Sequence, residues 1–398
     1  MLLSFKYRLY PNDEYEAQLK STLATLCDLY NELRSRKVSE YKENKINLSK
    51  TDLRKLALEI RRSNQELKKA HSQVVQNVAD RVSYAFNNFF EKRARFPRAK
   101  KNKNYRSFTY PQIRIRYNEE RRAHSLSLGI GQVRIFIHRP MLGKINRLTI
   151  KREAGEWYAI FLIEKEDVTA KNMLEIPDER IRGADIGIER FITLDDSSSS
   201  VYLRFLRRSE MMITKLQKRL SRKKKRSSNR KELAFRLARL HLHIKRQKED
   251  YQNKLVSTLL NKDTDVLVLE RLSIENMLQN HYLAKSLSDA SFGRFATKCL
   301  NKAVMLGRLV VFVDPWGTTQ FCYNCLEWVP KDLSERDHNC LKCGVNLSRD
   351  LNSAKLIKSL GIHSSPPSDG GSSPAELLPL PSLRRMASKS EEAGSQLL

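Results

Sequence analysis

The chain has 398 residues, 40% of them hydrophobic, which is enough for roughly two or three domains with real cores. Lysine and arginine number 74 against 45 acidic residues, and the formal net charge of +29 favours a polyanionic partner, nucleic acid before an anionic membrane surface. The longest apolar run covers only residues 157–163, and the N-terminal segment has no signal-peptide core, which together exclude membrane-spanning and secreted proteins.

The first part of the chain predicts a strand, then helices, then more strands. Apolar and polar side chains alternate in the first segment, which is the pattern of a half-buried strand, and the pattern stops at Pro11. Apolar side chains at helical spacing then indicate amphipathic helices. The expected elements are a strand over 3–9, helices over 19–33, from Thr51 and over 74–89, and strands over 148–150 and 157–163.

From Gly183 onward, the pattern indicates a mixed α/β sheet. Two of the strands are continuous apolar runs, which is typical of central strands covered on both faces. The last segment, 361–398, is rich in Ser, Pro and Gly without a helical or strand period, and we expect it to be a disordered tail. Strands are expected over 183–194, 201–206, 264–269 and 308–313, and a helix over 233–244.

The strongest local motif is a pair of Cys-x-x-Cys knuckles. Two thiolates in each turn can face one ion, so two knuckles complete the tetrahedron of a structural zinc site; four buried structural cysteines are the alternative. Six cysteines are too few for a disulfide scaffold and indicate a reducing compartment. His338 is a spare potential ligand that we expect in a solvated loop, and Cys27 and Cys299 are expected in cores. The proposed zinc ligands are Cys322, Cys325, Cys340 and Cys343.

Three acidic residues lie in or at the ends of expected elements. Asp185 is expected in the middle of a strand, between Gly183 and Gly187, which let another backbone or a phosphate approach. Glu270 ends an apolar strand, and Asp350 opens a helix after the second knuckle. Each alone has an ordinary explanation. Asp185 could be an acidic residue of a turn, Glu270 could contact solvent at the end of its strand, and Asp350 could be the N-cap of its helix. In a chain of this charge, however, a converging acidic pocket suits cleavage of a phosphodiester with two divalent metal ions.

The order of these motifs resembles the TnpB family, the OrfB-type proteins of bacterial and archaeal insertion sequences and relatives of the type V CRISPR effectors. The motifs are a GADIG strand, a VLVLE strand, the paired knuckles and an RDLNSA helix. Segments such as FKYRLYP, SRKKKRSSNRKE and LPLPSLRRMAS extend the resemblance over nearly the whole chain. The departures, Ser348, Ser353 and Leu326, avoid the metal-ligand positions, although Leu326 replaces a glycine of the first knuckle.

The resemblance implies an RNA-guided DNA endonuclease, encoded by a transposable element, that cuts beside a short flanking motif. Asp185, Glu270 and Asp350 would be its catalytic acids and would hold Mg²⁺ or Mn²⁺, while the four cysteines hold zinc. The implied partners are a guide RNA of the omega RNA type and double-stranded target DNA, with no required protein partner and no membrane. The implied location is the bacterial or archaeal cytoplasm, in association with the nucleoid.

The implied architecture is a multidomain protein of mixed α/β and α+β class. A RuvC-like nuclease domain of RNase H type carries a zinc-ribbon insert, and a helical recognition lobe and a small β-barrel-like wedge domain precede it. The expected ranges are 1–10 with 96–180 for the wedge, 11–95 for the recognition domain, 181–360 for the nuclease domain and about 315–347 for the insert.

Several residues are candidates for nucleic-acid contacts. A basic run suits phosphate neutralisation, although it could be an ordinary solvated loop. Tyr105 lies among lysines and arginines and could stack on a base, with Thr109 beside it, or both could belong to a β core. Gln73 and Gln76 could read a purine edge of the flanking motif, although surface glutamines are common. The basic run consists of Arg222, Lys223, Lys224, Lys225 and Arg226.

Two other classes of function remain open at this point. One is a guided DNA-binding protein, such as a repressor, that has lost the cleavage activity. The presence of all three acids argues against this class. The other is a transposase that joins strands with similar metal chemistry.

Overall fold

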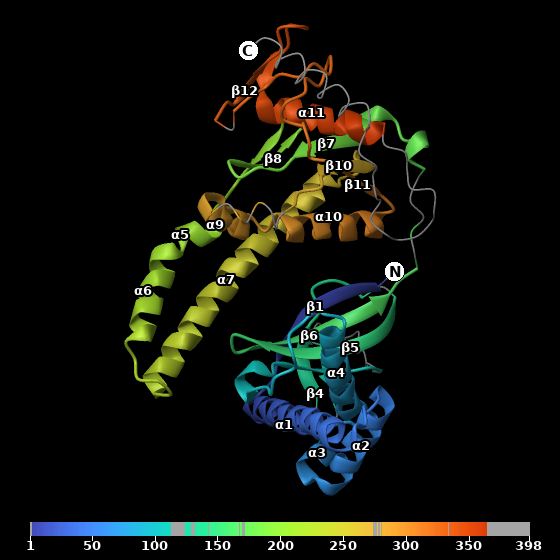
Figure 1. The fold of residues 1–398 in the computed structure, drawn as a ribbon, viewed down its shortest axis with the longest axis vertical. Helices are drawn as coiled ribbons and strands as arrows, with labels where there is room; N and C mark the ends of the chain where they lie inside the picture. The colour runs from blue at the N-terminus through green and yellow to red at the C-terminus, as the bar shows by residue number, and fades with distance from the viewer. Residues whose placement is uncertain are drawn as a thin grey trace. The chain divides into compact units, whose positions relative to one another are not determined.

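The computed structural model describes residues 2–112, 124–128, 132–141, 143–166, 168, 172–273, 277, 279, 281–332 and 334–363. These residues form two compact units, which divide between Glu166 and Asp167 (Figure 1). Within the described part of the chain, no helix is both long enough and apolar enough to cross a membrane. Residues 364–398 of the expected tail, which was predicted to begin at residue 361, lie outside the described residues.

The first unit is built on a six-stranded antiparallel sheet in the order β2-β5-β6-β1-β4-β3. The first strand of the chain lies inside this sheet, and its Leu3, Phe5, Tyr7 and Leu9 are buried, as the alternation predicted. The Tyr110 hydroxyl donates to the Leu128 carbonyl at 2.7 Å, which brings the two edges of the sheet together. The strands are β1 (Leu2–Tyr10), β2 (Ser107–Tyr110), β3 (His124–Ser127), β4 (Gln132–Phe136), β5 (Lys144–Glu153) and β6 (Glu156–Glu164).

The helices of the first unit begin at capping residues. Asn12 caps the first, and Ser49 forms a capping box with Asp52, so the second helix begins one residue before the expected Thr51. An ion pair of Arg54 with Asp80, 2.7 Å long, joins the second and fourth helices. The helices are α1 (Asp13–Asn44), α2 (Lys50–Ser63), α3 (Gln65–Lys69) and α4 (Ser72–Phe90), with a short 3₁₀ turn at Asn102–Asn104.

The second unit is built on a five-stranded mixed sheet in the order β11-β10-β7-β8-β9. The strands β11, β10 and β7 run parallel, whereas β8 and β9 pair antiparallel. Every residue of β10 is buried, as expected for a central strand, but β11 is an edge strand and only half-buried, so its expected central position was wrong. The strands are β7 (Ile181–Asp185), β8 (Arg190–Leu194), β9 (Ser199–Val201), β10 (Val266–Glu270) and β11 (Leu309–Val313).

Helices cover both faces of this sheet (Figure 1). Leu267 and Leu269 pack against α7 and α10, whereas Val266 and Val268 face α11. A long hairpin of α6 and α7 extends from the sheet. The helices are α5 (Phe205–Arg208), α6 (Glu210–Ser221), α7 (Ser228–Leu259), α9 (His281–Ala290), α10 (Phe292–Leu306) and α11 (Arg349–Ile362), with 3₁₀ turns at Met173–Glu175 and Asp178–Arg180.

Several further expected boundaries differ from the structure. The expected strand 183–194 is two strands, β7 and β8, which pair antiparallel. The predicted strand 201–206 ends at Val201 and gives way to α5, because the Asp289 carboxylate accepts the backbone N–H of Leu206 and fixes a helical start there. The second unit begins before residue 181, because Ile176 is buried in its core. Helix α11 continues to Ile362, two residues into the expected tail.

Candidate active site and zinc site

Two of the three acids lie side by side at the ends of parallel strands. In the β7–β10 pairing, Ala184 lies opposite Leu269, so the residues that follow, Asp185 and Glu270, reach the same edge of the sheet. Both are the last residues of their strands, and Glu270 is buried with 8% of its surface exposed. The expectation that a carboxylate emerges at a strand end is therefore confirmed for Glu270, whereas Asp185 was expected in the middle of a strand and instead ends β7.

Helix α11 brings the third acid to the same place. A Cβ atom on Gly183 would lie 2.2 Å from the Ala354 carbonyl oxygen, so the glycine lets the helix backbone contact β7 directly. Asp350 lies one turn before Ala354, in the first turn of α11. The helix N-cap is Ser348, whose hydroxyl accepts the backbone N–H of Leu351, so Asp350 is not the cap of its own helix, and its charge acts on Asp185.

The electrostatics show that the other two acids act on Asp185. Burial raises the pKa of Asp185 well above its ordinary value, and the charges of Glu270 and Asp350 raise it further, while Arg349 partly opposes this. Burial raises the pKa of Glu270 to about 7, and a hydrogen bond from Thr318 opposes the rise. Neighbouring buried carboxyl groups that resist ionisation, such as Asp185 and Glu270, suit hard divalent cations, whose charge would favour the ionised form.

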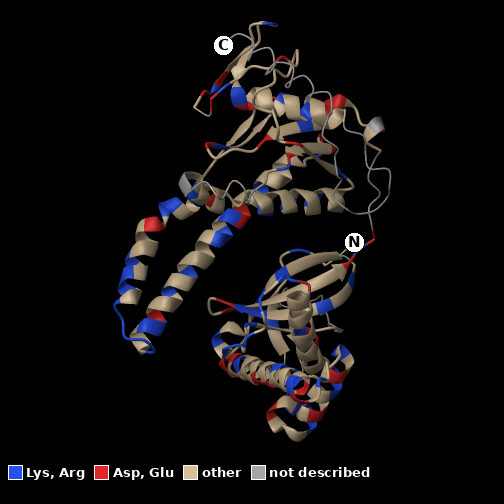
Figure 2. Ribbon diagram, viewed as in Figure 1, with Lys and Arg blue, Asp and Glu red and all other residues tan. Residues whose placement is uncertain are grey.

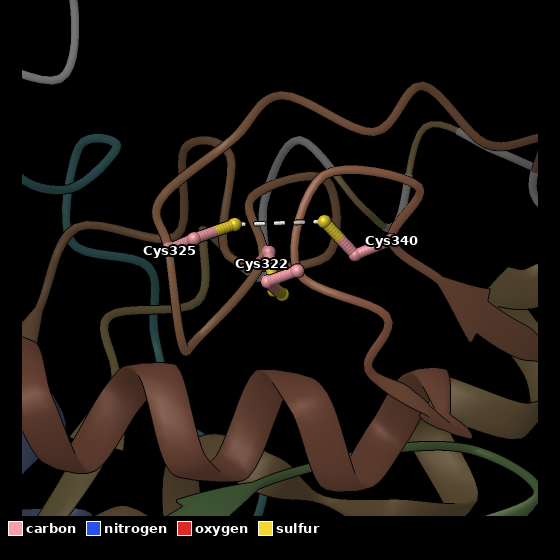
Figure 3. Close-up of side chains that lie close together, drawn as sticks. Cys322, Cys325 and Cys340 are labelled. Carbon is pink, nitrogen blue, oxygen red and sulfur yellow. Dashed lines mark hydrogen bonds between the residues drawn. The ribbon is translucent and has the colours of Figure 1, made fainter.

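The four knuckle cysteines form one cluster, as the spacing predicted. Their sulfur atoms all lie within 4.8 Å of one another, and those of Cys322 and Cys343 are 3.6 Å apart. The sulfur atoms of Cys325 and Cys340 are 3.5 Å apart (Figure 3). A tetrahedral zinc ion with bonds of about 2.3 Å sets sulfur atoms about 3.8 Å apart, whereas a disulfide would require about 2 Å. The cluster therefore fits a four-thiolate zinc site and does not fit disulfides.

Backbone groups of the second knuckle favour a thiolate. The backbone N–H of Val345 and the side chain of Asn324 lower the pKa of Cys343 to about 6. Gly344 turns this knuckle with a φ of +72°, whereas Leu326 occupies the matching place in the first knuckle with a φ of +58°. The departure at Leu326 therefore puts a side chain where the left-handed backbone favours glycine.

His338 differs from its expected place. It lies in β12 (Asp337–Asn339), which pairs with β13 (Asn346–Ser348), and its side chain is fully buried rather than solvated. Burial lowers its pKa to about 4, so the ring is neutral near pH 7. Cys27 and Cys299 are fully buried in the cores of the two units, as expected.

The candidate nucleic-acid contacts divide into exposed and buried groups. The basic run 222–226 is fully exposed in the loop between α6 and α7, where Figure 2 shows Lys and Arg gathered. Gln73 and Gln76 are half-buried near the start of α4, and Gln73 donates to the Gln112 side chain at 3.0 Å. The run is therefore open to a polyanion, and the two glutamines are partly accessible.

Tyr105 and Thr109 do not have the expected exposure. Tyr105 is 3% exposed and packs against the Tyr30 ring, with 6.3 Å between the ring centroids. The Thr109 hydroxyl lies in the sheet, 3.0 Å from both the Arg81 guanidinium and the Thr149 hydroxyl. Base stacking at Tyr105 was a wrong expectation, and the alternative of a β core holds, because both side chains are taken up by internal contacts.

One neighbour of the acids was not found from the sequence. The Thr318 hydroxyl is buried and hydrogen-bonds to Oε1 of Glu270. It lies in the segment between β11 and the first knuckle, which a single sequence does not mark as part of the acidic site.

Comparisons with known proteins agree with the motif order. Residues 170–281 match a family model described as "Probable transposase" (OrfB_IS605), residues 292–357 match "Cas12f1-like, TNB domain", and residues 1–45 match the helix-turn-helix domain of OrfB_IS605. A solved structure of "the mini-RNA-guided endonuclease CRISPR-Cas_phi3" shares the fold with a TM-score of 0.50 at 10% identity, over 91% of this chain and 92% of that one.

Two curated relatives are similar over most of their length. A Streptomyces pristinaespiralis protein named "Putative RNA-guided DNA endonuclease" is 29% identical, over 92% of this chain and 91% of its own. The Escherichia coli K12 protein "Putative RNA-guided DNA endonuclease InsQ" is 26% identical, over 90% and 92%. With three family models matched in order and these relatives, the chain is similar over most of its length to the TnpB (OrfB) family of insertion-sequence proteins.

Proposed function

We propose that the chain is an RNA-guided DNA endonuclease of TnpB type, encoded by a transposable element, whose second unit is a RuvC-like nuclease domain. The observation that carries this proposal is that Asp185 and Glu270 end adjacent parallel strands, while the charge of Asp350 in the first turn of α11 acts on Asp185. The proposal takes the guide RNA and the DNA substrate from the names of the two relatives, both of which are called putative RNA-guided DNA endonucleases.

Asp185, Glu270 and Asp350 would hold Mg²⁺ or Mn²⁺, which when bound polarises the phosphate and activates water for hydrolysis. The sheet holds the first two carboxyl groups at fixed strand ends, and the contact of α11 with Gly183 fixes the third. Arg349 neighbours Asp350, with 3.9 Å from its Nε to Oδ1, and supplies a positive charge beside the acids. This set of residues suits a hydrolase of phosphodiesters.

Binding and sequence reading would use other parts of the chain. The exposed run 222–226 supplies charge density to an RNA or DNA backbone without distinguishing bases. Base pairing with the guide would read the target, so the protein itself needs to read only the short flanking motif. Gln73 and Gln76 are the candidates for that contact.

Cleavage by purified complex tests the proposal. Asp185→Asn, Glu270→Gln and Asp350→Asn should each lower DNA cleavage in Mg²⁺ by about three orders of magnitude, since metal clamping contributes several kcal/mol, with little change in RNA affinity. Asp178→Asn, at an exposed position of the same unit, is the matched control. Near-normal cutting by all three variants, or copurification of only random RNA, would refute the proposal.

The same experiment distinguishes the two alternatives. A strand-joining transposase is favoured by the description of the matched family model and would give joined products from a donor DNA. A repressor would bind the target and leave it uncut, in the wild type as well as in the three variants.

A further inference from the structure

The segment between β11 and the first zinc knuckle touches the acidic site. Thr318 is 2% exposed, and its hydroxyl hydrogen-bonds to Oε1 of Glu270 and lies 3.0 Å from the Pro315 carbonyl oxygen. A hydroxyl can donate one hydrogen and accept another, so Thr318 can hold the carboxyl group in place in either protonation state. The orientation of Glu270 therefore depends on where this segment lies.

The knuckle itself is bound to the helix of the third acid. Asn352 is fully buried on α11, two residues after Asp350. Its Oδ1 accepts the backbone N–H of Tyr323 at 3.0 Å, and its Nδ2 donates to the Phe321 carbonyl at 2.7 Å. These two backbone groups flank Cys322, so one amide side chain fastens the metal-binding turn to the start of α11.

The knuckle and the segment before it form one packed piece. The ring centroids of Phe321 and Trp328 lie 4.8 Å apart, and Trp316 lies 5.8 Å from Phe321. Gly317, with a φ of +75°, lies against the Phe321 ring, where a Cβ would come within 2.7 Å of a ring carbon. A displacement of the knuckle would therefore be transmitted to the next residue, Thr318.

We propose that Thr318 and Asn352 are positioning residues that make the placement of Glu270 and Asp350 depend on the first zinc knuckle. The inference rests on the proposed nuclease function and assigns to the zinc site a role inside the active site. A module this short draws much of its folding free energy from the metal. Loss of zinc should thus release both hydrogen-bonded connections and loosen two of the three acids.

Hydrogen exchange of the full chain, with and without a zinc chelator, tests the coupling independently of cleavage. In the wild type, chelation should raise exchange at the end of β10 and in the first turn of α11, but not in the middle of α7. In Thr318→Val, the end of β10 should already exchange faster with zinc bound and should respond little to chelation, while α11 still responds. A rise confined to residues 318–345, or an equal rise in α7, would overturn the proposal.

Cleavage supplies the second measurement. Thr318→Val should cut about 10- to 100-fold more slowly than the wild type, the range expected for a lost hydrogen bond to a charged group, at equal zinc content and RNA affinity. Thr318→Ser keeps the hydroxyl and should restore the rate. Thr319→Val makes the same change at the neighbouring residue, whose backbone carbonyl accepts from Lys331 at 3.0 Å, and should be nearly silent.

The outcomes separate the two hypotheses. Equal cutting by Thr318→Val and Thr318→Ser would overturn the positioning role while the nuclease function stands. A wild type that does not cut would refute the proposed function, and the exchange pattern alone would then decide whether the knuckle holds Glu270 and Asp350.

Discussion

Glu270→Gln should stabilise the second unit at neutral and higher pH. Burial raises the pKa of Glu270 from its ordinary 4.5 to about 7, which corresponds to about 3 kcal/mol of unfavourable free energy once the group is ionised in the folded protein. Glutamine keeps the size of the side chain and can still bond to Thr318, but it carries no charge. The variant therefore avoids the unfavourable free energy of a buried, ionised carboxylate, which the wild type has at the proposed metal site.

The sign of the pH dependence follows from the two pKa values. Well below pH 4.5 the carboxyl group is protonated in both states, so the substitution should change little. Between pH 4.5 and 7 the unfolded chain ionises while the folded chain keeps its proton, so the wild type loses stability relative to the variant. The gain should be under about 1 kcal/mol at pH 5 and close to about 3 kcal/mol at pH 8.

Urea unfolding followed by tryptophan fluorescence would measure this difference. In a Trp157→Phe background the remaining tryptophans, Trp316 and Trp328, both lie in the second unit and report on it alone. Glu335→Gln, at an exposed position, is the control and should show no pH-dependent gain. Mg²⁺ should stabilise the wild type and narrow the gap. An equal gain at pH 5 and pH 8 would refute the reasoning.

Three other experiments test the zinc site, the helix contact and the basic loop by substitution. Cys325→Ser should remove the one expected zinc, counted by mass spectrometry of the purified protein, because three thiolates do not complete the tetrahedron; stoichiometric zinc in the variant would contradict this. Gly183→Ala should cost about 2–4 kcal/mol in unfolding free energy, because its methyl group would lie 2.2 Å from the Ala354 carbonyl. Gly344→Ala, whose methyl group meets open space, is the comparison and should cost only about 1 kcal/mol for its left-handed backbone; equal losses would contradict the contact. Replacing all five basic residues at 222–226 by Gln should weaken RNA binding and flatten its dependence on salt, measured as the slope of log affinity against log salt concentration; an unchanged slope would exclude this loop from binding.

The cysteine cluster and the acid that ends β10 were predictable because their signals are local. A two-residue gap between cysteines and an acid at the end of an apolar run each survive in the sequence without knowledge of the fold. That Asp185 and Glu270 meet follows from parallel pairing of their strands. The role of Gly183 as a point of close backbone approach was also indicated by its place in a strand, although the partner, α11, was not.

The missed features all depend on contacts between distant residues. Tyr105 lies among cations in the sequence, which suits a base-stacking site, but the fold covers its ring with Tyr30 and directs Lys100 and Arg81 over its face. The start of α5 is fixed by Asp289, which lies 83 residues from Leu206 in the chain. No periodicity carries such information, because the chain positions involved belong to different elements.

The same reasoning explains why β11 was expected to be a central strand. A continuous apolar run indicates burial, but it does not say how many strands lie beside it. In the structure β11 pairs with β10, and the Arg271 backbone N–H donates to the Val313 carbonyl at 2.9 Å just beyond the pairing. Its other edge has no strand partner among the described residues.

In the proposed function, the second unit separates charge used for binding from charge used for chemistry. Attraction between cations and phosphates acts over several ångströms and tolerates imprecise geometry, so the run 222–226 can serve from an exposed loop at the end of a helical hairpin. Carboxylates that clamp reacting atoms need placement within about 0.5 Å, which a buried strand such as β10 and a helix packed on Gly183 can provide. Neutralising the loop should therefore raise the concentration of complex needed for half-maximal cutting without changing the rate at saturation. Substitutions of Glu270 should instead lower the rate at saturation without changing the concentration of complex needed for half-maximal cutting.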